Sequence, residues 1–421
     1  MSIAYLLGAG FSRAVSDHMP VMNDLSKQIT EHLADRQFGN VPRVEEFSND
    51  FEAWMTYLSS DEPWLTESEN LRNRAAFYEV SAAVASVIIG AQNRVFSESI
   101  PAWLTTLVHE WKYSSSTVIS FNYDEIVEAA VQTALRDADE PRNTNVYPLP
   151  LTPPDTRFPQ GLSFGSSGDL AFHLLKLHGS VNWHYSGLDA PTSDPIYLFS
   201  GNSGWTPRTE YPSHQSARPD LLVDKSPLIV PPTSVKTAFY GNKILRAAWR
   251  LAASALESAH ELHVIGYSAP ESDLLVRALI GTQFSGSKVV CVNRTDSAAN
   301  KIRDFFPTNR EVVVESVHGV PKYVQDFLPD AWINCVNNSS GDHQSETILN
   351  LATDSNKTVA RGYCTLCRSS SLAPSTQGQL PHHRCPCCSS MWRGTTSFYY
   401  VRGYATVALN GNGQSLYRTN Q

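Results

Sequence analysis

The chain has 421 residues, of which 42% are hydrophobic and 18% charged, and its formal net charge is −8 at pH 7. This composition is typical of a globular protein rather than a disordered one, and the length predicts two or three domains. No apolar run reaches the ~18 residues of a membrane span, and the first residues lack the basic segment and cleavage site of a secretory signal. The acidic balance argues against a nucleic-acid-binding surface over the whole protein, although a local basic patch is compatible with it.

Seven cysteines are present, and five of them lie between Cys364 and Cys388. An odd number in such a cluster is typical of a reduced protein with one metal site rather than of a disulfide framework. We therefore expect a cytoplasmic protein without a membrane segment.

The chain begins with a short apolar run, Ser2–Leu7, followed directly by Gly8-Ala9-Gly10-Phe11-Ser12-Arg13. This pattern predicts a strand, a tight turn and a helix, because glycines let the backbone turn sharply and approach a ligand. Free N–H groups at the start of a helix favour a phosphate, to which Ser12 would add a hydroxyl and Arg13 a positive charge. The third glycine of the usual dinucleotide motif is replaced by Arg13. A purely structural strand, turn and helix fits this stretch as well.

A series of helices is predicted next, because apolar residues recur at helical spacing. The segments are Met22–Arg36, Phe51–Ser59, Leu71–Phe96 and Ala102–Trp111. We expect them to form a helical lobe, at about residues 22–113, inserted between the first strand and the next. Their aromatic and aliphatic stripes are interpreted as core.

Two further strands end in polar residues. Ser116–Phe121 is followed by Asn122-Tyr123-Asp124 and a helix from Glu125 to about Leu135, and Leu174–Leu177 is followed by His178-Gly179-Ser180. Residues 140–170 and 183–225 are rich in Pro, Gly and Ser and are predicted to be loops. Leu228–Val230 is a short strand beyond them.

From Asn242 onward, helices and strands alternate regularly. The predicted elements are helix Lys243–His260, strand Leu262–Ile265, helix Leu274–Ile280, strand Lys288–Val292, helix Ser297–Phe306 and strand Glu311–Glu315. This alternation predicts an α/β fold with a Rossmann-like parallel sheet and helices on both faces. Ligands of such sheets bind at the carboxyl ends of the strands. The polar residues that follow the strands should therefore converge on one crevice: Gly8–Arg13, Asn122–Asp124, His178–Gly179, Gly266–Ser268 and Asn293.

These residue types suit one kind of chemistry. The two glycine turns, with Ser12 and Ser268, can approach a pyrophosphate, and Asn293 can reach a ribose or a base. Asn122 can orient water or a ribose hydroxyl, Asp124 is a carboxylate, and His178 can act as a general base. Such a set suits cleavage of a glycosidic bond with an activated leaving group, such as nicotinamide on NAD.

Structural roles are the alternative for each of these residues. Asn and Asp commonly cap helices, so Asn122 and Asp124 could cap the helix that follows them. Ser268 and Asp273 could cap the helix from Leu274 in the same way. His178, one of thirteen histidines, could be a core residue.

Four segments, in order, resemble the signature of sirtuin-type NAD-binding domains: Gly8-Ala9-Gly10-Phe11-Ser12, Phe121-Asn122-Tyr123-Asp124, Leu177-His178-Gly179-Ser180 and Gly266-Tyr267-Ser268. The resemblance runs from about residue 3 to 330 and is strongest to the bacterial sirtuin-like branch found in anti-phage defence, through Leu177–Trp183, Ile229–Thr233 and Gly266–Asp273. It implies that Asn122 and His178 are a catalytic pair. It also implies that NAD is consumed and is contacted by Gly8, Ala9, Gly10, Ser12, Asp124, Gly266, Ser268 and Asn293. To these contacts we add Arg13, Tyr267 and Asp273.

The chain departs from the protein-deacylating sirtuins in three places. Where they have Gly-Ile-Pro-Asp-Phe-Arg, this chain has His18–Asp24 and keeps only the proline. Residues 179–265 contain no cysteine, so the zinc module of the deacylases is missing there, and no Phe-Gly-Glu segment follows His178. We therefore expect water to be the nucleophile, which predicts an NAD⁺ hydrolase that releases nicotinamide and ADP-ribose. An NAD-dependent protein deacylase and a non-catalytic sensor or scaffold are the alternative hypotheses.

The resemblance implies a biological setting as well. Enzymes of that branch act as anti-phage effectors that deplete NAD, so their activity must be held off until it is triggered. We expect a homo-oligomer and an activating protein partner, for which a HerA-type ATPase is a candidate.

The carboxyl-terminal part is predicted to be a separate module at residues 359–421, after a linker at 331–358. Cys364-x-x-Cys367 and Cys385-x-x-Cys388 are separated by seventeen residues, which is the spacing of a zinc ribbon with four thiolate ligands. Cys387, His382 and His383 are alternative ligands. Strands are expected within Ser397–Leu409, and a module of this size needs its structural zinc to fold.

Three arginines, Arg368, Arg384 and Arg393, give this module a modest basic set. We interpret it as a solvated face rather than a nucleic-acid patch. Direct binding of nucleic acid stays open.

Overall fold

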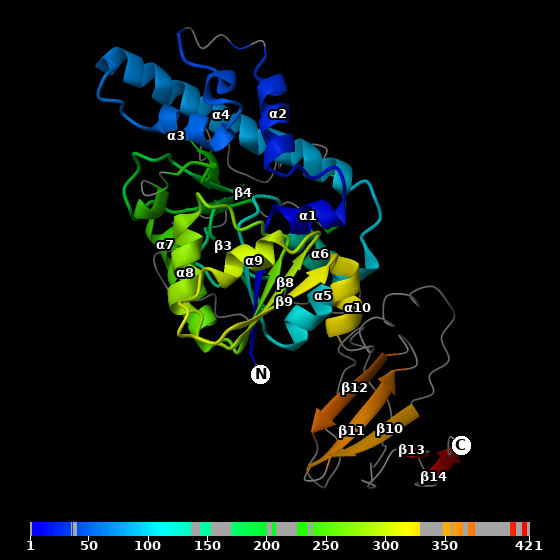
Figure 1. Ribbon diagram of the computed structural model, residues 1–421. Helices are drawn as coiled ribbons and strands as arrows, with labels where there is room; N and C mark the ends of the chain where they lie inside the picture. The colour runs from blue at the N-terminus through cyan, green and yellow to red at the C-terminus, as the bar shows by residue number, and fades with distance from the viewer. Residues whose placement is uncertain are drawn as a thin grey trace. The chain divides into compact units, whose positions relative to one another are not determined.

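The computed structural model describes residues 2–34, 36, 40–135, 144–152, 170–199, 204–207, 225–234, 236 and 239–328, and five strands between 348 and 418. The chain divides into two compact units (Figure 1). The first unit contains Met1–Ile100, Ser114–Thr133 and Asn143–Val320, and the second contains Pro101–Tyr113, Ala134–Arg142 and Pro321–Gln421.

The first unit is built on a six-stranded sheet in which every pair of neighbouring strands is parallel. Its strands are β1 (Ile3–Leu7), β2 (Thr117–Ser120), β3 (His173–Lys176), β7 (Glu261–Ile265), β8 (Lys288–Asn293) and β9 (Val313–His318). They lie in the order β3-β2-β1-β7-β8-β9. Counted along the chain this is 3-2-1-4-5-6, the order of doubly wound dinucleotide-binding sheets, and it reverses between β1 and β7. The central strand is apolar because it is covered on both faces, and Tyr5, Leu6 and Leu7 are fully buried.

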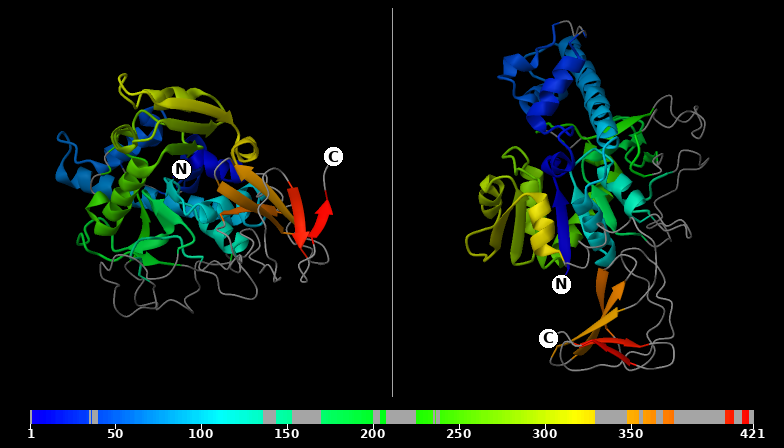
Figure 2. Two further views of the ribbon diagram at one scale, coloured as in Figure 1. Left: turned by 90° about the horizontal axis from the view of Figure 1, so that it is seen from below. Right: turned by 90° about the vertical axis from the view of Figure 1, so that its right-hand side faces the viewer.

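Helices flank this sheet, as predicted. They are α1 (Ala9–Val15), α6 (Ile126–Ala134), α7 (Lys243–Ser258), α8 (Leu274–Gln283) and α9 (Ser297–Arg303). The two halves of the sheet extend in opposite directions from β1 and β7, so right-handed crossovers place α6 on one face and α8 and α9 on the other (Figure 2). The predicted α/β fold with a parallel sheet is confirmed.

A helical lobe follows α1, at the carboxyl ends of the strands (Figure 1). It contains α2 (Met22–His32), a short 3₁₀ helix η1 (Val44–Phe47), α3 (Phe51–Ser59) and α4 (Glu67–Val95), and both α2 and α3 pack against α4. The start of α4 is fixed by a capping box between Thr66 and Glu69. α5 (Ala102–Tyr113), which we expected to be the last helix of this lobe, belongs to the second compact unit.

α4 has an unexpected composition. One 18-residue window has a mean hydropathy of 1.4, so this helix is long and apolar enough to cross a membrane by length and composition. Half of that window is buried inside the protein. A core helix passes the same criterion, and packing of α2 and α3 on α4 accounts for the apolar residues.

A small antiparallel sheet follows β3. Its strands are β4 (Gly179–Tyr185), β5 (Tyr197–Leu198) and β6 (Ser226–Ile229), in the order β5-β4-β6. β4 begins at Gly179, whose φ is +78°, and a side-chain carbon added there would lie 2.0 Å from the carbonyl oxygen of Leu228. Only glycine fits at this position, and this sharp turn fixes His178 between β3 and β4. The segment 183–225, which was predicted to be a loop, contains the end of β4 and all of β5. The sequence interpretation missed these strand residues.

The second unit contains α5, α10 (Val320–Phe327, which begins at the boundary) and a five-stranded antiparallel sheet. Its strands are β10 (Ile348–Asp354), β11 (Lys357–Cys364), β12 (Ser369–Pro374), β13 (Ala405–Leu409) and β14 (Ser415–Arg418), in the order β12-β11-β10-β13-β14. β10 lies within the segment that we expected to be a linker. Cys364 is the last residue of β11, whereas Cys367, Cys385 and Cys388, with the alternatives Cys387, His382 and His383, lie outside the described residues. The zinc ribbon stays a prediction, and the described part of the chain contains no cluster of metal-binding side chains.

Candidate active site

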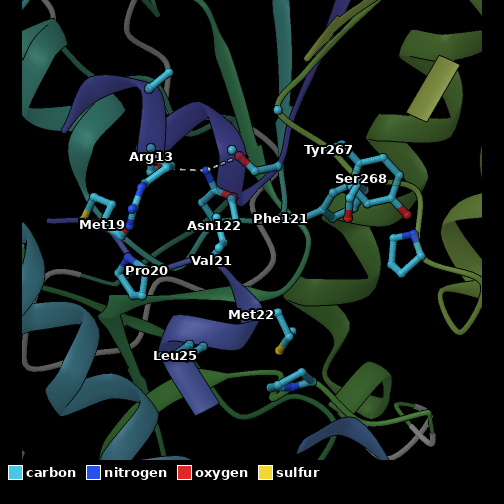
Figure 3. Close-up of a pocket in the computed structure, with 18 of the residues that line it drawn as sticks. Arg13, Met19, Pro20, Val21, Met22, Leu25, Phe121, Asn122, Tyr267 and Ser268 are labelled. Atoms are coloured by element: carbon cyan, nitrogen blue, oxygen red, sulfur yellow. Dashed lines mark hydrogen bonds between the residues drawn. The ribbon is translucent and has the colours of Figure 1, made fainter. Parts of the chain in front are cut away.

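A pocket of about 520 Å³ lies at the carboxyl ends of the parallel strands in the first unit (Figure 3). The predicted catalytic residues Asn122 and His178 both line it. So do all the residues that were predicted to contact NAD: Gly8, Ala9, Gly10, Ser12, Arg13, Asp124, Gly266, Tyr267, Ser268, Asp273 and Asn293. Met22, Glu52 and Ile88 of the helical lobe close its other side. The expected convergence of the strand ends on one crevice is confirmed, whereas the role of each side chain there stays a prediction.

The two glycine turns pack directly against each other at the point where the strand order reverses. The N–H of Gly8 donates to the carbonyl of Ile265 at 3.0 Å, and the N–H of Gly10 donates to the carbonyl of Gly266 at 2.8 Å. A side chain on Gly8 would come within 2.6 Å of the Tyr267 Cα, and one on Gly266 within 2.0 Å of the Phe11 nitrogen. We interpreted these glycines as places where a ligand approaches. The structure adds that these glycines are needed for the close approach of one turn to the other. The N–H groups of Gly8, Gly10 and Gly266 are all used already, since that of Gly266 donates to the carbonyl of Val292 at 2.8 Å.

Arg13 is paired with acidic side chains of the segment that follows α1. Its guanidinium lies 3.1 Å from Asp17 and 3.0 Å from Asp24 and donates to the carbonyl of Met19. Residues 19–23 of this segment line the pocket, and Figure 3 shows Arg13 beside Met19 and Pro20. We expected Arg13 to offer a free positive charge to a pyrophosphate, but Asp17 and Asp24 largely compensate that charge. Arg13 instead holds this segment against α1.

Asn122 connects β2 to the first glycine turn. Its side-chain nitrogen donates to the carbonyl of Gly8 at 3.0 Å and to the Ser12 hydroxyl at 2.9 Å (Figure 3). The Ser12 hydroxyl in turn donates to Asp124 Oδ2 at 2.7 Å. Both hydrogens of the Asn122 amide are therefore used, which leaves its oxygen as the group free to bind a ligand.

Asp124 has the structural role that we considered as an alternative. Its Oδ1 accepts the N–H of Ile126 at 3.2 Å and so caps α6. Burial raises the pKa of this carboxyl group, and the nearby Lys176 and the Ser12 hydroxyl only partly oppose that effect. Asp124 thus fixes both the helix behind the pocket and the Ser12 hydroxyl within it.

Lys176, at the end of β3, is a buried lysine beneath these residues that sequence reasoning missed. Only 1% of it is exposed. Its ammonium donates to the Ser180 hydroxyl at 2.7 Å, to Glu128 at 3.0 Å and to the carbonyl oxygens of Tyr123 and Asp124. Because these two carbonyls belong to the turn that carries Asn122, Lys176 fixes the position of that turn.

His178 is buried, with 7% of its surface exposed, and its ring packs against Phe121 and Trp249. Its Nε2 is buried and has no hydrogen-bond partner among the described residues. Burial lowers the pKa of His178 well below the usual value, and the positive charge of Lys236 lowers it further. The imidazole is therefore neutral at neutral pH and can accept a proton. An unpartnered buried nitrogen in a pocket indicates a place for a ligand or a water molecule.

An ion pair that the sequence did not indicate forms part of the wall. Lys236 Nζ lies 3.3 Å from Asp273 Oδ1, and the Tyr267 hydroxyl donates to Asp273 Oδ2 at 3.0 Å. Asp273 is at the N-cap position of α8 but makes no side-chain capping bond there, so its partners are these two groups. On the lobe side, Glu52 accepts a hydrogen bond of 2.7 Å from Ser272. No sequence motif identifies Lys236 or Glu52 as a site residue. Lys236 is a single charged residue in a loop, and Glu52 is a single charged residue on α3.

The far end of the pocket is more open. Ser268 is exposed, and the side-chain nitrogen of Asn293 donates to the carbonyl of Tyr267 at 3.2 Å. Asn293 Oδ1 accepts the backbone N–H of Arg294, whose exposed side chain also lines the pocket. Asn293 therefore steadies the second glycine turn.

No protein-family model and no curated protein sequence matches the chain. Among solved structures, it is similar to a Sir2 homologue in complex with NAD, at 14% identity and a TM-score of 0.38, over 80% of this chain and 89% of that one. A mutant Sir2 homologue in complex with ADP-ribose is similar at 13% identity and a TM-score of 0.35, over 80% of this chain and 92% of that one. Values this low transfer neither an activity nor a ligand to this protein.

Proposed function

We propose that this protein binds NAD across the strand ends and hydrolyses the bond between nicotinamide and ribose. The observation that carries the proposal is that Asn122 and His178 line the same pocket as the two glycine turns, at the reversal of strand order. Dinucleotides bind at such reversals in open α/β sheets. The volume of about 520 Å³ lies in the range of roughly 300–1,000 Å³ that is typical of small-molecule sites.

Bond cleavage makes modest demands on the protein. The electron pair of the C1′–N bond moves onto the nicotinamide nitrogen, which is positively charged in NAD⁺ and so needs no general acid. An oxocarbenium-like ribose is left behind. The Asn122 oxygen, held in place because the amide nitrogen is tied to Gly8 and Ser12, would accept a hydrogen bond from a ribose hydroxyl or from the attacking water.

The neutral imidazole of His178 then supplies the base. Water adds to C1′ and loses a proton to His178, which passes it to solvent, so that NAD⁺ and water give nicotinamide, ADP-ribose and H⁺. The lowered pKa of His178 keeps the imidazole unprotonated at neutral pH, so that its nitrogen is available as an acceptor.

The test is incubation of the purified protein with NAD⁺ in H₂¹⁸O, followed by mass spectrometry of the products. We expect nicotinamide and ADP-ribose with one ¹⁸O. Asn122→Ala and His178→Ala should each lower turnover by about 10²-fold or more, whereas His260→Ala, an exposed histidine outside the pocket, should not. Circular dichroism would verify that each variant is folded.

Two results would overturn the proposal. If NAD binds but is never cleaved, the non-catalytic sensor is the better hypothesis. If nicotinamide appears only when an acyl-lysine peptide is added, and an acylated ADP-ribose is formed, the protein is a deacylase.

We also propose, from the sequence resemblance alone, that this activity serves anti-phage defence and is released by a protein partner or by self-assembly. The same assay with and without a HerA-type ATPase, accompanied by sedimentation of each mixture, tests this. A turnover rate that is independent of the ATPase and of the oligomeric state would contradict it.

A further inference from the structure

The pocket extends across the sheet from the catalytic pair to a second, more distant group of residues. Asn122 follows β2 and His178 follows β3, whereas Asn293 and Arg294 stand at the end of β8 and Gly319 follows β9. Three strand spacings separate β2 from β8, or about 14 Å at the usual distance of ~4.8 Å between strands. A dinucleotide with its nicotinamide ribose at Asn122 and His178, and its pyrophosphate at the glycine turns, would have its adenosine end near β8.

The charge at this end is not balanced. Arg294 is exposed and lines the pocket, and within the described residues its guanidinium has neither a hydrogen bond nor an ion pair. Asp296, the nearest carboxylate in the sequence, is 2.9 Å from His318 and is not among the pocket residues. Hydrogen bonds from Ser316 and His318 lower the pKa of Asp296, so its charge is engaged there.

The other two cations that line the pocket are both neutralised. Arg13 is paired with Asp17 and Asp24, and Lys236 is paired with Asp273. Arg294 therefore differs from them: among the charged pocket residues that the structure describes, it is the cation with capacity for a new anion.

We propose that Arg294 is a specificity-determining residue that lets the pocket accept a 2′-phosphate on the adenosine ribose, so that NADP⁺ is a substrate as well as NAD⁺. Sites that select NAD⁺ place a carboxylate on the 2′-hydroxyl, whereas an arginine at that place accommodates the phosphate. Guanidinium and phosphate form charge-assisted hydrogen bonds, often in pairs. This inference rests on the proposed function and on the direction in which that function orients the dinucleotide.

The experiment measures kcat/KM for NADP⁺ and NAD⁺ with the wild-type protein and with Arg294→Ala, Arg294→Glu and Arg250→Ala. The wild-type protein should use NADP⁺ within about tenfold of NAD⁺. Loss of a charge-assisted contact should lower the NADP⁺ to NAD⁺ ratio about tenfold or more in Arg294→Ala, and further in Arg294→Glu, where repulsion is added. Arg250, an exposed arginine of α7 outside the pocket, is the matched control and should leave the ratio unchanged.

The possible failures are distinct. If the wild-type protein cleaves NAD⁺ but rejects NADP⁺, or if the ratio is the same in Arg294→Ala as in the wild type, this inference is wrong and the proposed function stands. If neither nucleotide is cleaved under any condition, the proposed function is wrong and this inference falls with it.

Discussion

The two halves of the parallel sheet present different kinds of residue to the same pocket. At the ends of β2 and β3 the side chains are buried: Lys176, Asn122 and His178 are at most 8% exposed. At the ends of β7 and β8 the pocket residues Ser268 and Arg294 are exposed. The first half is suited to chemistry, which needs groups fixed in a dry environment, and the second to recognition of a ligand that arrives from solvent.

The connections of the chain explain this difference. After β3 the chain turns at Gly179 into the small sheet, and α4 of the lobe packs against β4 and β6 of that sheet. From β7 to β9 the connections are single short helices, α8 and α9, and Ser268 and Arg294 at the start of these connections are exposed. The burial that lowers the pKa of His178 belongs to the first half, where its ring packs against Phe121 and Trp249.

Disrupting the contact between the two glycine turns, where the two halves of the sheet meet, should have the largest effect on stability. Gly266→Ala would force a residue with a side chain into φ +67° and would place its Cβ 2.0 Å from the backbone nitrogen of Phe11. Strain and overpacking together should lower the free energy of unfolding by about 3 kcal/mol or more, measured by urea denaturation. The control Gly241→Ala should be nearly neutral, because nothing lies within 4 Å of the Cβ that this position would gain. Equal stability of the two variants would show that the turns are not locked together.

The regular half of the fold could be predicted from the sequence because its signals are local. The predicted strand Lys288–Val292 and the observed β8, Lys288–Asn293, nearly coincide, since a buried parallel strand is a continuous apolar run. Polar residues directly after such runs identify the site, because parallel strands bring their carboxyl ends to one edge. That is why Asn122 and His178 could be assigned to one pocket.

The remaining parts depend on contacts that are distant in sequence. β4 pairs with β6 more than forty residues away, and the end of β4 lies in the stretch 183–225, whose Pro and Ser content predicts a loop. Lys236 becomes significant only through its partner Asp273, and the motif that contains Arg13 does not reveal that Asp17 and Asp24 compensate its charge. Partners of this kind are set by tertiary packing, and no local pattern encodes them.

The buried network of the first half gives the next largest effect. Lys176→Met removes the ammonium beneath the Asn122 turn and leaves Glu128, which is 12% exposed, without its cation. Breaking such a pair should lower the free energy of unfolding by about 3 kcal/mol and should reduce kcat more than it raises KM, because the turn loses its support. Lys288→Met is the matched control: its pair with Glu315 is 30% and 43% exposed, so the loss should stay below about 1 kcal/mol. If both variants lose the same stability, burial does not distinguish the two pairs.

The smallest effect concerns the protonation of His178. Its pKa is lowered by burial and by Lys236, so kcat/KM should stay constant as the pH falls through the usual histidine range and should decline only below it. Lys236→Met removes the positive charge, raises the pKa of His178 and moves the acid limb of the profile to higher pH. In this variant the negative charge of Asp273, which still accepts a hydrogen bond from Tyr267, also raises the pKa of His178. The exposed Lys243→Met should leave the limb in place, and an unchanged limb in Lys236→Met would mean that burial alone sets this pKa. The same sign applies to folding: because the native state resists protonation of His178, the free energy of unfolding should fall as the pH drops below the ordinary histidine pKa.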